Sequence, residues 1–116
     1  MQPAPSVSRR ARPVAAPPTS PSTDLRELER PRAEIDHLDR VLVRLLNLRA
    51  RLALGAAALK RRAGAPLRAP QREREVLENV ISTNPGPLNR RAVLAVFRAV
   101  IRESRRLEED RFGAQL

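Results

Sequence analysis

A long apolar stripe constrains the fold of this chain more than any other feature of its sequence. Between residues 31 and 62, apolar side chains recur at alternating steps of three and four residues, the spacing of one face of an α-helix. They are Ile35, Leu38, Leu42, Leu45, Leu52, Ala56 and Leu59. A helix over residues 31–62 would be about 48 Å long at 1.5 Å per residue, whereas a compact chain of about 100 residues has a radius of gyration of only ~13 Å. Since two shorter helices cannot cover the whole stripe, it predicts an intertwined homodimer.

Turn and capping signals divide the rest of the chain into two shorter helices. A Gly-Ala-Pro sequence at 64–66 ends the long helix, and Pro70 suits the first position of a second one. The Asn-Pro-Gly-Pro sequence at 84–87 indicates a loop, after which Asn89 can cap a third helix. No segment alternates with the period of a strand. The sequence therefore predicts an all-α chain of three helices with the long helix first.

The N-terminal 22 residues differ in composition from the rest. They hold six of the eleven prolines and three arginines, with no acidic residue, so a disordered arm is expected. Thr23 or Asp24 can then cap a first helical turn, and Pro31 either starts or kinks the long helix. The expected organisation is an arm over 1–22, a helical domain over 23–112 and a short tail over 113–116.

Charge and composition restrict the function classes. Basic residues outnumber acidic ones 23 to 13, which suggests nucleic acid or another polyanion as partner. The chain has no cysteine and one histidine, His37, which is interpreted as a solvent-facing helix residue, so no metal site is expected. No apolar run reaches the roughly 20 residues of a membrane helix. The N-terminus lacks a secretory signal, so a cytoplasmic location is expected. Of the 23 basic residues, only Lys60 is a lysine.

Each expected helix carries polar side chains at places where the pattern calls for apolar ones. Arg49 and Lys60 fall on the long stripe, eleven residues or about three turns apart. The others are Arg72 and Glu73 in the first turn of the second helix, and Ser104 and Glu108 on the apolar row of the third. Each alone is explained by solvation or by a side chain reaching from the edge of the stripe. Together they would place cations in a partly buried cluster, which is costly unless an anionic ligand completes it.

Four blocks of the sequence resemble the all-helical chorismate mutases. They span residues 28–39, with Ile35-Asp36-His37-Leu38-Asp39, then 45–53, 66–77 and 96–108, and Lys60 lies at the matching distance between the second and third blocks. The resemblance covers residues 24–110 and rests on four blocks in order at matching spacing. It implies an intertwined dimer of three-helix chains. The implied activity is the pericyclic rearrangement of chorismate to prephenate in Phe and Tyr biosynthesis, with no cofactor and no metal.

The resemblance also implies which residues bind the substrate carboxylates. Arg49 and Arg72 would hold the two carboxylates of chorismate, together with Arg32 contributed by the other subunit. Ser104 would help seat a carboxylate. Bidentate pairing of guanidinium with carboxylate explains why arginine suits these positions.

The remaining implied roles concern the ether oxygen and the hydroxyl of chorismate. Lys60 would donate to the ether oxygen as the C–O bond breaks, and Glu108 would be directed at the same atom. Because a carboxylate would repel the developing charge, Glu108 should work protonated, with its pKa raised by burial. Glu73 would accept from the hydroxyl. The family usually carries Asp where this chain has Ala69, which leaves Glu73 to serve that hydroxyl alone.

Several alternatives stay open at this stage. The same fold carries an isochorismate pyruvate lyase activity, and Ala69 also fits a regulatory mutase-like domain of weak activity. The net charge motivates a basic helical protein that binds nucleic acid or acts as an adaptor, although no aromatic side chains interleave with the basic ones for base stacking. The resemblance extends to mutase domains fused to enzymes at the start of the shikimate pathway, so association with another enzyme of that pathway is a further possibility.

Overall fold

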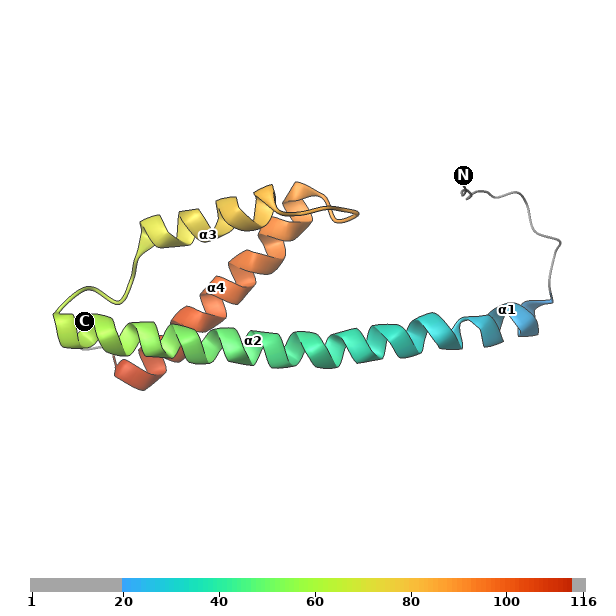
Figure 1. Ribbon diagram of the computed structural model, residues 1–116, viewed down its shortest axis with the longest axis horizontal. Helices are drawn as coiled ribbons and strands as arrows, with labels where there is room; N and C mark the ends of the chain where they lie inside the picture. Colours follow the sequence, from blue (N-terminus) through green and yellow to red (C-terminus); the bar gives the residue numbers. More distant parts are fainter. Residues whose placement is uncertain (1–19, 114–116) are drawn as a thin grey trace, which may run out of the picture. The chain divides into compact units, whose positions relative to one another are not determined.

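A computed structural model describes residues 20–113 of the chain and shows four helices and no strand within that range. They are α1 (Pro21–Glu27), α2 (Glu29–Ala63), α3 (Pro70–Ser82) and α4 (Arg90–Phe112) (Figure 1). The all-α class is confirmed, with one long helix and two shorter ones after it. Nearly all of the expected arm over 1–22 and tail over 113–116 lies outside the described residues. Among the described helices, none combines the length and apolar character that crossing a bilayer requires.

The described part of the chain divides into two units, residues 20–39 and residues 40–113. In the first unit, Ser20 caps α1, because its Oγ accepts from the Thr23 N–H at 3.2 Å and Pro21 occupies the start of the helix. The expected cap at Thr23 or Asp24 is therefore wrong, since the Ser-Pro pair supplies an acceptor and a preset backbone angle a few residues earlier. Pro31 lies in the first turn of α2, where helical N–H groups lack partners in any case.

In the second unit, local signals set the ends of the helices as the sequence predicts. Helix α2 ends where Gly64 adopts a left-handed backbone with φ of 72°, and the Ala65 N–H bonds back to the Lys60 carbonyl at 2.8 Å. Pro70 opens α3, and the Asn89 side chain caps α4 by accepting from the Ala92 N–H at 2.9 Å. Figure 1 shows α3 in yellow and α4 in orange to red, joined by the loop over 83–89.

The buried core of the described residues is small. It consists of Ala57 on α2, Leu67 in the loop before α3, and Val93 and Ile101 on α4. The stripe of α2 is not part of it: Leu42, Leu45, Leu52 and Leu59 are each more than half exposed. Apolar surface of this extent on one helix is typical of an interaction surface.

Candidate active site

A cavity of about 740 Å³ lies within the second unit, lined by α2, the loop before α3, α3 itself and α4. Its volume is that of a site for a small organic molecule. The apolar part of the lining includes Leu52, Leu67, Val76 and Ile101. The charged part holds five basic and three acidic side chains: Arg49, Lys60, Arg68, Arg72, Arg105, Glu73, Glu108 and Glu109. The excess of basic groups favours an anionic ligand.

Six of the seven side chains that the sequence singled out line this one cavity. They are Arg49 and Lys60 from α2, Arg72 and Glu73 from α3, and Ser104 and Glu108 from α4. The seventh, Arg32, is exposed in the first turns of α2 and belongs to the other unit. Ala69 also lines the cavity and contributes only a methyl group.

The two cations of α2 that line the cavity donate to neutral acceptors. Arg49 Nη1 donates to Ser104 Oγ at 3.2 Å, which ties α2 to α4. Lys60 Nζ donates to the Leu67 carbonyl at 2.8 Å, which ties the end of α2 to the following loop. Both side chains are partly buried, and neither forms an ion pair with a described residue. Their charges are therefore available to an anion in the cavity.

The two charged residues that open α3 differ in their surroundings. Arg72 is exposed, and its Nη1 lies 3.3 Å from Glu75 Oε1 on the same helix. The same side chain lines the cavity, and its pair with Glu75 uses only Nη1. Glu73 instead accepts from Arg105 Nη2 of α4 at 2.7 Å, in a partly buried ion pair.

Sequence reasoning missed three charged lining residues, Arg68, Arg105 and Glu109, of which Arg105 forms an ion pair with a predicted site residue. Arg105 is one of 22 arginines, and nothing in its immediate neighbours distinguishes it. A signal was nonetheless present, since Arg105 follows Ile101 by four residues and precedes Glu108 by three. These spacings place the three side chains on one face of α4.

The environment of Glu108 favours its protonated form. Burial raises the pKa of Glu108 above its ordinary value of 4.5, and the negative charge of Glu73 raises it further. The positive charges of Lys60, Arg105 and Arg49 oppose this, but the net direction is upward. A larger fraction of Glu108 than of an ordinary glutamate therefore carries a proton and can donate a hydrogen bond.

The cavity combines cations for an anionic ligand with one carboxyl group that can act as a donor. Such a site can bind a small dianion and stabilise negative charge that develops within it. Among residues 20–113, no group of three or more His, Cys, Asp or Glu side chains is arranged to hold a metal ion.

Residues 31–109 match the family model for chorismate mutase type II. The bifunctional chorismate mutase/prephenate dehydratase of Aquifex aeolicus (strain VF5) is 35% identical in an alignment of 89 residues that covers 73% of this chain and 25% of that protein. This chain thus spans about a quarter of the length of that relative.

Solved structures give the same result. The form II structure of chorismate mutase from Thermus thermophilus has a TM-score of 0.70 and 32% identity, covering 72% of this chain and 94% of that one. Chorismate mutase from Helicobacter pylori, solved in complex with prephenate, has a TM-score of 0.66 and 35% identity, covering 72% and 90%.

Fold, cavity and these matches define the class as an all-helical isomerase. The chain belongs to the chorismate mutase type II family. The family and the enzyme class that the sequence implied are confirmed.

Proposed function

We propose that the second unit catalyses the rearrangement of chorismate to prephenate in its cavity. The observation that carries this proposal is the set of charges that meet there. Arg49 and Lys60 donate to neutral groups and form no ion pair with a described residue, and burial raises the pKa of the neighbouring Glu108. Chorismate offers the complement, with two carboxylates and an ether oxygen that gains negative charge as its bond breaks.

The reaction is a single pericyclic step, in which the ether C–O bond breaks as a new C–C bond forms. No proton, nucleophile or cofactor takes part, so the task of the protein is to hold the reactive conformer and to stabilise the polarised transition state. Arg49 and Arg72 bind the carboxylates, and Ser104 supports Arg49 through their hydrogen bond. Arginine suits this role because its fork of donors matches a carboxylate.

Lys60 and Glu108 act on the ether oxygen. The ammonium of Lys60 supplies a compact positive charge, and protonated Glu108 supplies a second hydrogen bond. Both interactions strengthen as negative charge builds on the oxygen, so they stabilise the transition state more than the bound substrate. The apolar lining of the cavity strengthens them further by lowering the local dielectric.

Glu73 accepts from the substrate hydroxyl. Among the cavity-lining residues of α3 and the preceding loop it is the one carboxylate, and the Ala69 side chain there has no polar atom. The hydroxyl end of the substrate is thus recognised by a single acidic side chain on this side of the cavity.

The functional unit is a homodimer. The exposed leucines of α2 support this, because in a second chain they would find an identical apolar face to pack against. Arg32 of each subunit then completes the cavity of the other. The bifunctional relative from Aquifex aeolicus supports association with another shikimate-pathway enzyme. The cytoplasmic location of the protein stays a prediction.

A direct assay tests the proposed activity. Purified protein is added to chorismate, and prephenate is expected to form as chorismate disappears, with isochorismate assayed in parallel. Pyruvate released from isochorismate without any prephenate would assign the lyase activity instead. DNA binding that weakens steeply with salt, without turnover of either substrate, would favour the nucleic-acid-binding alternative.

Activity is expected to fall as pH rises through the raised pKa of Glu108. The protonated carboxyl donates to the ether oxygen, and its raised pKa keeps it protonated to a higher pH than an ordinary glutamate. Glu108→Gln keeps a neutral donor at every pH and should flatten this part of the kcat profile. Glu78→Gln, at an exposed position on α3, should keep the wild-type profile. A Glu108→Gln profile identical to that of the wild type would exclude this role.

A further inference from the structure

One ion pair in the second unit differs from all others among the described residues. Arg105 Nη2 lies 2.7 Å from Glu73 Oε1, and the two side chains are 29% and 26% exposed. It joins α4 to α3, whereas each other described pair lies within one helix and has both side chains at least half exposed. Exposed ion pairs contribute little to the free energy of folding. A partly buried, hydrogen-bonded ion pair between two helices, in contrast, fixes the geometry of both side chains.

The geometry of the pair leaves the second oxygen of Glu73 free for another partner. Oε1 accepts from Arg105, and Oε2 has no hydrogen bond to any described residue. Arg105 Nε is buried and has no acceptor among the described residues, while Nη2 of the same guanidinium donates to Glu73. A buried unsatisfied donor calls for an explanation, and a role in a functional site is one such explanation.

We propose that Arg105 is a positioning residue of the active site. By holding Oε1 of Glu73, it orients the carboxylate so that Oε2 faces the cavity and accepts from the substrate hydroxyl. Without this anchor, a glutamate in the first turn of a helix samples many rotamers, and the hydroxyl loses a fixed acceptor. This inference rests on the proposed mutase function and assigns the residue that orients its hydroxyl acceptor.

The charge of Arg105 also acts on Glu108. Lys60 and Arg49 of α2 and Arg105 of α4 lower the pKa of Glu108, whereas Glu73 of α3 raises it. The other charged side chains of the cavity are Arg68, Arg72 and Glu109. Removing Arg105 takes away one opposing charge and leaves Glu73 uncompensated, so the pKa of Glu108 must rise further. A loss of helix packing alone would not produce this upward shift.

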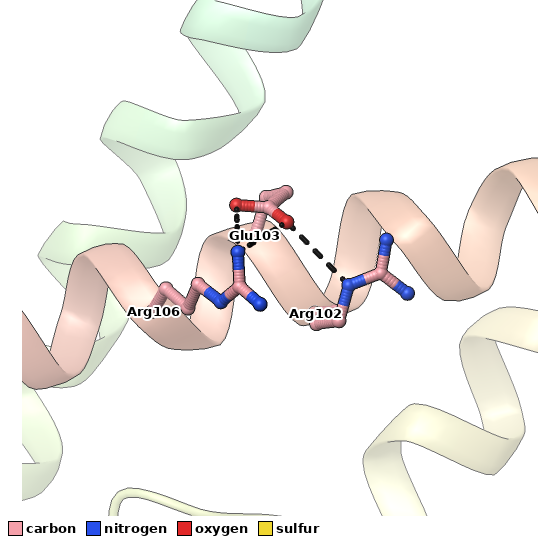
Figure 2. A network of polar contacts seen from close by, with 3 residues as sticks. All are labelled: Arg102, Glu103 and Arg106. Carbon is pink, nitrogen blue, oxygen red and sulfur yellow. Dashed lines mark hydrogen bonds and ion pairs between the residues drawn. The ribbon is translucent and has the colours of Figure 1, made fainter.

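Two substitutions and one matched control separate these effects. Arg105→Gln removes the charge, and Arg105→Lys keeps it. The control is Arg102→Gln, which removes one arginine from the exposed side of the same helix. Glu103 pairs with Arg102 at 3.4 Å and with Arg106 at 3.1 Å, so it keeps a cation when Arg102 is replaced. Both contacts are drawn in Figure 2.

Arg105→Gln is expected to lower kcat/KM for chorismate on the order of tenfold and to move the high-pH limb of activity upward. The kcat/KM of Arg105→Lys should stay within a few-fold of the wild-type value, and its high-pH limb should not shift. Arg102→Gln should match the wild type in kcat/KM and in the position of the high-pH limb. The proposal is overturned if Arg105→Gln behaves like Arg102→Gln, or loses activity without the upward shift. If Arg105→Gln fails to fold, a soluble Arg105→Lys variant with a shifted limb and a tenfold loss overturns it equally.

The failure of this inference can be told apart from a failure of the proposed function. Carboxyl ¹³C NMR titration of Glu108 without substrate needs no turnover. The pKa of Glu108 should be higher in Arg105→Gln than in Arg102→Gln, and equal values would exclude the electrostatic role of Arg105. A wild-type chain that forms no prephenate would instead overturn the proposed function.

Discussion

Lys60→Ala is expected to lower turnover of chorismate at least about a hundredfold, because removing one preorganised donor to a developing negative charge has an effect of that size. The side chain is partly buried at the cavity and its ammonium is not neutralised by an ion pair with a described residue. The positive charge thus stays available for the ether oxygen. The comparison is kcat for the variant and the wild type at saturating chorismate.

Two further variants make this result specific. Lys60 also donates to the Leu67 carbonyl, so its loss affects the loop as well as the chemistry. Arg62→Ala, which removes an exposed cation from the same last turn of α2, should retain activity. Lys60→Arg restores the charge with a wider planar group and should recover part of the turnover. A Lys60→Ala variant with wild-type kcat and unchanged helicity by circular dichroism would contradict the proposal that this cavity is the mutase active site.

Mixing two inactive variants is expected to restore activity. If Arg32 of each subunit completes the cavity of the other, each active site takes Lys60 from one chain and Arg32 from its partner. Arg32→Ala and Lys60→Ala dimers are then both inactive, because each substitution affects both sites. In a mixed dimer, one site carries both substitutions and the other carries neither. Random exchange of equal amounts should give about a quarter of wild-type activity, since half of the dimers are mixed and each holds one intact site.

The control is each inactive variant mixed with itself, which should stay inactive under the same exchange conditions. Sedimentation measurements on the wild type should give the mass of two chains. A monomeric mass with full activity, or a mixture that never recovers activity although mixed dimers form, would contradict the shared site.

Local structure could be predicted from the sequence because each signal acts through a few neighbouring atoms. Asn89 caps α4, Gly64 ends α2 and Pro70 opens α3, as the residue types alone indicate. The start of α1 shows where this reasoning fails. Thr23 and Ser20 both have side chains that can cap, and the choice between them depends on Pro21, whose backbone angle suits the first helical position.

Helical periodicity was enough to predict those site residues that interrupt an apolar face. Arg49 and Lys60 stand out because they interrupt an apolar stripe, and the structure places both on the cavity. Which groups pair across helices could not be predicted, because that depends on how α3 and α4 pack. The pair between Arg105 of α4 and Glu73 of α3 was therefore not predicted.

The hydrogen bond from Lys60 to Leu67 has a consequence for how this segment can change in evolution. The acceptor is a main-chain carbonyl, which every amino acid possesses, so drift in side-chain identity leaves it in place. Leu67 itself is anchored by burial. Insertion or deletion between residues 64 and 69 would displace that carbonyl, whereas most exchanges at the exposed positions would not. Selection on this loop should therefore conserve its length more strictly than its composition.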